Sequence, residues 1–372
     1  MVNIFSLRTA AWLGVTVVAA AAAGCSSSTS SPSPSPSAAP KTLTVKQLIL
    51  GGPLHHTQPD DITALGGKLY VGFQNGVGAQ GEPAPSGNLN STLLEFTPTG
   101  SVVKQWSLPG KIDGMGADPA ANQVIVTVNE DSKSSLYTVS GAGTLTHYTY
   151  TPSPLPHMGG TDAVSVFQGK ILISASAPGT GGTAPKNAPA VYVVTLNSAT
   201  KIATAAPFFA INATATGVNA PNAGTKVTLA LTDPDSNSVV PSSSPAFAGK
   251  FMLNSQGDLQ LIFSDSSGQN LQLLKLSLPV DDTAWATSAS GSLYVTDSSA
   301  DAVDVITGPF KVGTAYTAVA PCNANTAPSV CPPPPPTTYK GNYLGTINLT
   351  TGAVSPLTFT GVLTPKGMVF VP

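Results

Sequence analysis

The chain is 372 residues long, only 9% of its residues are charged, and its formal net charge is -2. A surface that binds nucleic acid needs clustered Lys and Arg, so nucleic acid is excluded as an expected partner. The 41% of hydrophobic residues excludes a disordered chain, and the 36 glycines and 34 prolines indicate many turns between short apolar runs. This composition is typical of an all-β protein.

The N-terminal segment has the features of an export signal. Arg8 precedes an apolar run from Ala10 to Ala23, which is shorter than the about 20 residues of a membrane-spanning helix and matches the apolar region of a secretory signal. The run ends at Ala22-Ala23-Gly24-Cys25, which resembles the lipobox of bacterial lipoproteins. The resemblance implies that residues 1–24 are removed as a signal peptide and that Cys25 becomes the acylated N-terminus. Secretion after cleavage at an Ala-x-Ala site is the alternative.

Residues 25–41 form the next segment. Ser26 to Pro40 contains almost only Ser, Thr, Pro and Ala, without a charge or an aromatic residue, so it cannot bury enough apolar surface to offset the entropy cost of ordering. We expect a disordered tether between the lipid and a folded domain that covers residues 42–372. The cell membrane is then a partner through Cys25, where several acyl groups such as palmitate bind more firmly than one. The folded domain is expected on the extracytoplasmic face.

An internal repeat organises the chain after the tether. Each unit opens with Asp and continues with a short apolar strand, a tight turn and a second strand. The clear copies are Asp60–Leu65 with Lys68–Val71, Asp113–Ala117 with Gln123–Val126, Asp162–Val166 with Lys170–Ile173, and Asp281–Trp285 with Ser292–Val295, the last turning near Ser290-Gly291. A degenerate copy lies around Val227–Asp235, and Lys366–Val371 resembles the opening strand of one more.

Hairpins with polar turns separate these units, for example Leu93–Phe96 with Val102–Trp106. Two strands plus a hairpin make a four-stranded blade, and repetition of this unit is the signature of a β-propeller. Counting the strands predicts six blades, with five or seven as alternatives. The N-terminal strand Thr42–Leu50 would pair with C-terminal strands to close the ring. Two β-sandwich domains are another all-β alternative, but they do not explain the repeat.

The pattern from Thr42 to Pro372 resembles the six-bladed propellers of the NHL-repeat and SMP-30 (gluconolactonase-like) superfamily. In the SMP-30 family a divalent ion sits at the mouth of the central channel, held by acidic and Asn side chains. No cofactor follows from the residues themselves, but the resemblance implies Ca²⁺ or another divalent cation at that place. This chain lacks the family's opening Glu-Gly-Pro signature, so the resemblance does not imply lactonase activity.

The predicted blades also differ between their two faces. Loops between strands one and two, and between strands three and four, lie on one face of a propeller, and here they are tight, as at Gly66-Gly67. The connections of the other face include Gln74–Asn90, Ala177–Ala188 and the segment from Cys322 to Cys331. Long loops on a rigid scaffold are where binding residues gather. We therefore expect this face to bind the ligand.

The Asp that opens each unit lies directly before the innermost strand, so we expect these carboxylates around the central channel on the long-loop face. They are Asp61, Asp113, Asp162 and Asp282, and the connections before them carry His55, His56 and His157. Neighbouring carboxylates repel unless they bind a cation, share protons or are separated by solvent, and an oxygen-rich ring suits Ca²⁺. These residues form the candidate ligand or metal site. The structural alternative is that each Asp caps a turn by accepting hydrogen bonds from backbone amides.

Two cysteines remain once Cys25 carries the lipid. Cys322 and Cys331 are close in the sequence, and in an oxidising compartment we expect them to form a disulfide. Metal binding by this pair is the alternative.

The sequence contains no Gly-x-Ser-x-Gly, His-Glu-x-x-His or Gly-Lys-Ser/Thr motif. Our leading hypothesis is therefore a lipid-anchored monomer that is not an enzyme and whose long-loop face binds a small molecule, glycan or protein. The alternative is a divalent-metal-dependent hydrolase or lyase that uses the Asp residues at the channel.

Overall fold

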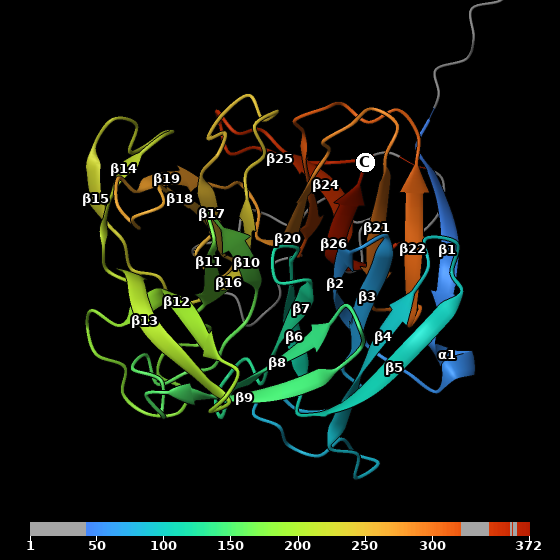
Figure 1. Ribbon diagram of the computed structural model, residues 1–372. Helices are drawn as coiled ribbons and strands as arrows, with labels where there is room; N and C mark the ends of the chain where they lie inside the picture. The colour runs from blue at the N-terminus through green and yellow to red at the C-terminus, as the bar shows by residue number, and fades with distance from the viewer. Residues whose placement is uncertain (1–41, 321–341, 358, 360–362) are drawn as a thin grey trace, which may run out of the picture. The chain divides into compact units, whose positions relative to one another are not determined.

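Figure 1 shows the computed structural model of the protein. It describes residues 42–320, 342–357, 359 and 363–372, so the predicted signal peptide, Cys25, the tether and the Cys322–Cys331 pair lie outside the described residues. Apart from the short helix α1 (Gly51–Leu54), the elements of the described part are strands, and none of its helices has the length and hydrophobicity of a bilayer-spanning segment. The predicted all-β fold is confirmed.

The strands pair in antiparallel groups of four, which we call blades. Blade 1 contains β2 (Pro59–Leu65), β3 (Lys68–Phe73), β4 (Asn90–Phe96) and β5 (Val102–Pro109). Blade 2 contains β6 (Ile112–Asp118), β7 (Gln123–Val128), β8 (Ser135–Ser140) and β9 (Leu145–Thr151). Blade 3 contains β10 (Val164–Phe167), β11 (Lys170–Ser174), β12 (Pro189–Asn197) and β13 (Ile202–Ala210), and parallel pairing of β13 with β9 joins it to blade 2.

The remaining strands form three further groups within the described residues. Blade 4 contains β16 (Pro234–Val239), β17 (Phe251–Ser255), β18 (Gln260–Ser264) and β19 (Gln272–Lys275), extended by β14 (Thr214–Gly217) and β15 (Lys226–Thr228). Blade 5 contains β20 (Val280–Trp285), β23 (Ala315–Val319), β24 (Tyr343–Ile347) and β25 (Val354–Pro356). Blade 6 contains β26 (Pro365–Val371), β21 (Ser292–Asp297), β22 (Ala302–Thr307) and β1 (Thr44–Leu50).

The innermost strands of these blades form a closed ring. In order they are β2, β6, β10, β16, β20 and β26, each contacts the next, and β26 contacts β2. The blades therefore surround a central axis, which is the arrangement of a β-propeller. Two stacked sheets, as in a sandwich, would not give this circular order of contacts.

Blades 5 and 6 are interleaved along the chain. The sequence predicts one hairpin from Asp281–Trp285 and Ser292–Val295, and this prediction is wrong. β20 is the innermost strand of blade 5, whereas β21 lies in blade 6 and pairs with β22 and β26. Because β26 takes the inner edge of β21, β20 pairs instead with β23. The stretch around Ser290-Gly291 is thus a crossing between blades.

The first and last strands lie in the same blade. β1 pairs with β22 as the outermost strand of blade 6, and β26 is its innermost strand. The N-terminal strand therefore does join C-terminal strands in one sheet, with β22 as its direct partner.

Hydrophobic side chains fill the spaces between neighbouring blades. Alternate residues of a strand point to opposite faces of its sheet, and each blade packs with both faces against its neighbours. In one such cluster, Tyr70 and Leu93 of blade 1 pack with Val126 and Tyr137 of blade 2. Burial of a single leucine stabilises a fold by roughly 1.5–3 kcal/mol, so these clusters hold the inner strands in place around the axis.

The connections differ between the two ends of the blades. Gly66 and Gly67 join β2 to β3 with φ values of 58° and 74°, the conformation of a tight two-residue hairpin turn. At the other end, residues 74–89 join β3 to β4, seen as the cyan segment at the bottom of Figure 1, and residues 175–188 join β11 to β12. The inner strands begin at this end. The long connections and the starts of the inner strands therefore share one face, the long-loop face.

Candidate ligand-binding cavity

A break in strand pairing marks the beginning of the inner strands. The pairing register shifts between Pro59 and Ile62 in β2, and at the matching place in the others. Three other inner strands have the same shift: β6 between Ile112 and Met115, β16 between Pro234 and Asn237, and β20 between Val280 and Thr283. In β26 the pairing with β21 skips from Pro365 to Met368. Such bulges twist the strand and re-aim its side chains.

The first bulge residue points to the axis, and in most blades it is Asp. These residues form what we call the axial ring, which consists of Asp60, Asp113, Asp162, Asp235, Asp281 and Lys366. Asp162 occupies the same place directly before β10, where its N–H donates to the carbonyl of Ser174. The ring follows the order of the blades, so Lys366 lies between Asp281 and Asp60.

The axial ring lines a cavity of about 330 Å³ on the axis, the axial cavity. Eight carboxyl groups line it, those of Asp60, Asp61, Asp113, Glu130, Asp162, Asp235, Asp281 and Asp282. The structure thus brings together the four aspartates that the sequence singles out. It adds others that the sequence reasoning missed, above all Asp235, which stands at the end of the degenerate copy, and Lys366, which replaces the repeated Asp in the C-terminal strand.

Two of the predicted aspartates connect neighbouring inner strands. Asp61 accepts hydrogen bonds from the N–H of Ile62 at 2.6 Å and from the N–H of Met115 on β6 at 2.5 Å. Asp282 does the same with Thr283 at 2.6 Å and with Met368 on β26 at 2.6 Å. For these two residues the geometry is that of the structural alternative, because their oxygens cap backbone amides. We call them the clasp aspartates.

Glycine at the second bulge position allows the inner strands to approach. A Cβ on Gly114 would lie 2.3 Å from the carbonyl oxygen of Asp162, and a Cβ on Gly367 would lie 2.3 Å from that of Asp60. Real Cβ atoms are not found so close to a backbone atom, so any side chain here would push two inner strands apart. These glycines keep the ring narrow.

Lys366 is held between two ring carboxylates. Its Nζ lies 3.0 Å from Asp60 and 3.9 Å from Asp281, and 39% of its side chain is exposed. The charges of Asp60 and Asp281 raise the pKa of Lys366. Lys366 is therefore an ammonium group inside an otherwise acidic ring.

Asp113 is the most deeply buried ring carboxylate, with 3% of its side chain exposed. Its Oδ1 accepts a hydrogen bond from Gln74 Nε2 at 3.1 Å and forms an ion pair with Lys111 Nζ, also at 3.1 Å, and Lys111 pairs with Glu130 as well. Its Oδ2 is buried and has no partner within the described residues. Burial and the charge of Glu130 raise the pKa of Asp113, against the opposing effect of Lys111. One oxygen of this carboxyl group thus lacks a donor.

The carboxyl groups of Asp162 and Asp235 both line the axial cavity, and each affects the pKa of the other. Two neighbouring carboxyl groups in a buried site do not both ionise readily. Burial raises the pKa of Asp162 to about 7, and burial and the Asp162 charge raise the pKa of Asp235. The pair therefore retains a proton near neutral pH.

The cavity residues do not fit the divalent-ion site that the sequence resemblance implies. In the part of the chain that the structure describes, no three His, Cys, Asp or Glu side chains are grouped so that they could hold one metal ion. Calcium takes roughly 6–8 oxygen ligands, whereas the ring carboxylates here interact with Lys366, with Lys111 or with each other.

The candidate histidines lie outside the axial cavity. His55 is exposed at the end of α1 with a φ of 60°, and His56 pairs with Gln105. His157 is fully buried, with Nδ1 2.7 Å from the hydroxyl of Tyr192 and Nε2 2.7 Å from the carbonyl of Gly160. Since a carbonyl only accepts, Nε2 carries the hydrogen, and burial lowers the pKa of His157 to about 4. His55 and His157 are not among the described residues that line the axial cavity, so the structure does not group them with the carboxylates.

No family model and no curated protein sequence matches this chain. Solved structures similar to it include a catalytically inactive virginiamycin B lyase from Staphylococcus aureus with quinupristin, at 11% identity over 88% of this chain and 96% of that chain, with a TM-score of 0.42. A putative gluconolactonase is similar at 10% identity over 86% and 83% of the two chains, with a TM-score of 0.42. A protein of unknown function from Bacteroides caccae is similar at 11% identity over 84% and 86%, with a TM-score of 0.43. Structures that resemble this chain thus include gluconolactonase-like and streptogramin lyase proteins.

Proposed function

We propose that this protein is an exported, lipid-anchored binding protein that captures a cationic small molecule in its axial cavity. The observation that supports the proposal is the charge of the cavity, where eight carboxyl groups surround one lining lysine, Lys366. A cationic ligand would balance the excess of negative charge in the cavity.

The energetic argument follows from burial. Carboxylates that leave water are destabilised unless a cation or a hydrogen-bond donor pairs with them. The raised pKa values of Asp113, Asp162 and Asp235 reflect this cost, since burial is the largest cause in each case. A ligand that brings positive charge relieves this cost, whereas an anionic ligand increases it. The cavity volume of about 330 Å³ lies at the lower end for small-molecule sites.

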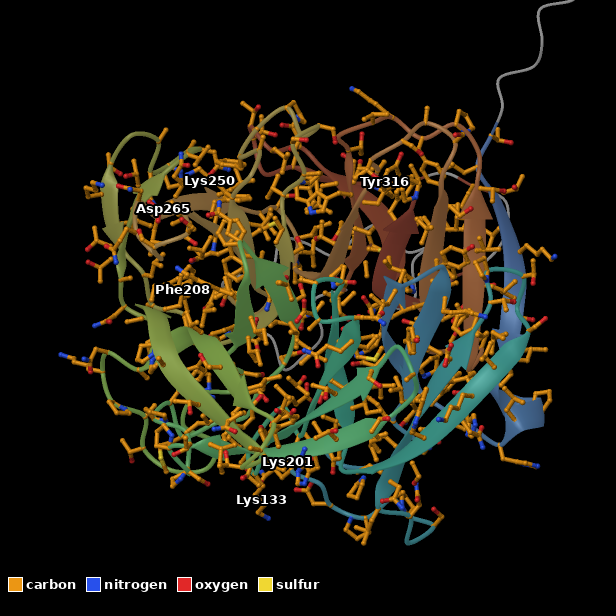
Figure 2. The ribbon with its side chains drawn as sticks, in the orientation of Figure 1. Lys133, Lys201, Phe208, Lys250, Asp265 and Tyr316 are labelled. Carbon is orange, nitrogen blue, oxygen red and sulfur yellow. The ribbon has the colours of Figure 1, made fainter. Side chains whose placement is uncertain are left out.

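The test uses the mature protein and matched sets of cationic, neutral and anionic small molecules, with binding measured by calorimetry. We expect binding of cations and no binding of anions. Asp235→Asn should weaken cation binding, and Asp265→Asn serves as the control. Asp265 lies in the turn between β18 and β19, on the outer side of blade 4 (Figure 2). Preferential binding of anions, or cation binding that Asp235→Asn leaves unchanged, would contradict the proposal.

The anchoring part of the proposal rests on Ala22-Ala23-Gly24-Cys25 and on the Ser/Pro-rich segment after it. Cys25→Ser should leave the signal peptide uncleaved and remove the incorporation of labelled palmitate. Cys322→Ser is the control, since it also replaces a cysteine by serine but should leave acylation intact. Release of wild-type protein without lipid, cut after Ala-x-Ala, would favour plain secretion instead.

The alternative function is a hydrolase or lyase that acts in the same cavity. The observation that favours it is the buried pair of carboxyl groups, Asp162 and Asp235, in the cavity lining, because two carboxyl groups with separated protonation states can serve as acid and base. This alternative predicts that a cavity ligand is consumed. Product analysis after incubation with wild type and with Asp162→Asn distinguishes turnover from simple capture.

A further inference from the structure

We propose that a second cavity, formed by the connections of the long-loop face, binds a neutral, hydroxyl-rich ligand and is a glycan site. This cavity has a volume of about 530 Å³, and we call it the loop cavity. Its lining residues come from the connections 74–89, 129–134, 152–163 and 175–188, together with Tyr150 near the end of β9. It shares no lining residue with the axial cavity, so the inference goes beyond the proposed capture of a cation and does not depend on it.

Hydrogen bonds between these connections fix the walls of the loop cavity. Ser132 Oγ donates to Gln80 Oε1 at 2.9 Å, which joins the connection after β7 to the connection after β3. The N–H of Gly181 donates to the carbonyl of Met158 at 2.8 Å, which joins the connections after β11 and β9. Small-molecule sites are usually formed before the ligand arrives and have volumes of roughly 300–1,000 Å³. The loop cavity meets both conditions.

Two lining residues have a backbone conformation that must be held in place. Lys133 and Met158 have φ values of 55° and 54°, which are uncommon for residues other than glycine and are often found at ligand sites. Asn129 Nδ2 donates to the carbonyl of Lys133 at 3.1 Å. His157, directly before Met158, is fully buried with both ring nitrogens hydrogen-bonded. The buried histidine therefore anchors the part of the wall that carries Met158.

The lining offers polar groups that have no partner among the described residues. They are Nε2 of Gln80, Nζ of Lys133 and the hydroxyl groups of Ser153 and Thr180. The side chains of Lys133, Ser153 and Thr180 are exposed, and that of Lys133 lies at the outside of the molecule (Figure 2). The amide and ammonium nitrogens only donate, whereas the two hydroxyl groups donate and accept. A matching ligand therefore supplies several acceptors and at least some donors.

The charges beside the loop cavity favour a neutral ligand. Lys133 is the charged residue of the lining, so a cation would meet a like charge there. An anion would approach Glu82, whose carboxylate accepts a hydrogen bond from the N–H of Gln80 at 2.8 Å. Hydrogen bonds from the N–H groups of Glu82 itself and of Gln80, together with the charge of Lys133, lower the pKa of Glu82. Glu82 is therefore ionised near neutral pH, and its charge balances that of Lys133.

The polar lining also excludes a purely apolar ligand. Such a ligand would cover the polar groups of Gln80, Ser153 and Thr180 without replacing their hydrogen bonds to water, which is costly. A sugar ring carries hydroxyl groups that donate and accept, and C–H groups on its faces. The C–H groups can contact the apolar part of the lining, which includes Pro154 and Leu155. The ligand class that matches both parts is a neutral oligosaccharide.

The test measures the binding of four trisaccharides to the mature protein by calorimetry at neutral pH. Maltotriose, cellotriose and tri-N-acetylchitotriose are neutral, and trigalacturonate is an anion of the same length. We expect at least one neutral trisaccharide to bind, and to bind more tightly than trigalacturonate. If none of the three neutral trisaccharides binds, or if trigalacturonate binds more tightly than all of them, the proposal is overturned.

Two variants with matched controls locate the site. Thr180→Trp places a large side chain at the loop cavity and should weaken trisaccharide binding at least about tenfold, whereas Thr183→Trp, exposed in the same connection but outside the lining, should not. Lys133→Met removes the ammonium and should lower the affinity up to about tenfold, since one hydrogen bond to a charged group is worth about that factor. Lys186→Met is its control, because Lys186 is exposed and lies outside the lining.

Thermal melts check that the variants are folded. Trisaccharide binding that a folded Thr180→Trp leaves intact overturns the loop cavity as the site. If Thr180→Trp does not fold, an unchanged affinity of Lys133→Met overturns it instead. Binding that is lost in Asp235→Asn and kept in Thr180→Trp would place the sugar in the axial cavity, which also overturns this inference, whereas the capture of cations is decided by its own test.

Discussion

The carboxylate of Asp282 on β20 accepts a hydrogen bond from the backbone N–H of Met368 on β26 at 2.6 Å, across 86 positions of sequence. This bond ties blade 5 to blade 6, the two blades whose strands are interleaved. The other clasp aspartate, Asp61, ties blade 1 to blade 2 in the same way. The repeated Asp therefore has two roles in this protein, closing the ring of inner strands at some positions and facing the cavity at others.

The first prediction concerns this clasp. Asp282→Ala removes the acceptor and leaves the N–H groups of Thr283 and Met368 without their side-chain partner. We expect the free energy of unfolding to fall by about 1–3 kcal/mol, measured by urea denaturation. Glu95→Gln on β4, outside the axial cavity, is the control, and an Asp282→Ala protein as stable as this control would contradict the assigned role.

The second prediction concerns the close approach of β6 and β10. Gly114→Ala places a Cβ 2.3 Å from the carbonyl oxygen of Asp162, whereas Gly52→Ala meets no atom within 4 Å. The first substitution should lower the free energy of unfolding by about 1–3 kcal/mol through overpacking, and the second should have little effect or stabilise the helical turn slightly. Thermal melts of both proteins provide the comparison. Equal melting temperatures would show that the inner strands are not packed as described.

The third prediction is that stability falls as the pH rises from about 6.5 to 8. Burial raises the pKa values of Asp162 and Asp282 to about 7, above the value of about 3.9 in an unfolded chain. The folded protein thus binds more protons than the unfolded chain between these values, and its stability decreases as the pH passes through 7. His157 acts in the opposite direction only below about pH 6.5, because it is neutral in both states above that value. The measurement is the melting temperature against pH, and Asp162→Asn should flatten the decline. A melting temperature that rises over this range would contradict the raised pKa values.

The fourth prediction links ligand binding to protons. A cation favours the ionised form of nearby carboxyl groups, so binding should release protons from groups such as Asp162, whose pKa is raised to about 7. The affinity for a cationic small molecule should therefore increase from pH 6 to pH 8. Calorimetry in two buffers with different ionisation enthalpies measures the released protons. The same heat in both buffers would mean that the ligand does not contact the titrating carboxyl groups.

Much of the arrangement of the axial carboxyl groups could be predicted from the sequence, because the Asp of each repeat lies at the bulge that opens an inner strand. An Asp before an apolar strand recurs at Asp113 and Asp162, and propeller geometry carries both to the axis. The unequal loop lengths likewise identify the long-loop face, since loop position follows directly from strand order within a blade.

Other features depend on pairing between distant segments. Which of Asp60 and Asp61 joins the axial ring, and which caps backbone amides, is decided by the register of β2 against β3, which the sequence does not define to a single residue. The position of Lys366 could not be found by searching for the repeated acid, because its charge is reversed. The crossing at Ser290-Gly291 has the length and composition of a hairpin turn, and only the pairing of β26 with β21 excludes a hairpin.

The membership of β1 and β26 in one blade sets an order of events during biosynthesis. A chain that emerges from its N-terminal end can complete blades 1–4 in sequence, but β20 must wait for β23, and β21 must wait for β26. Pairings between such distant segments form slowly, because the entropy of closing the intervening loop is lost before the contacts form. Lys366 arrives with the final strand, so Asp60 and Asp281 gain their ammonium partner only when the last blade closes.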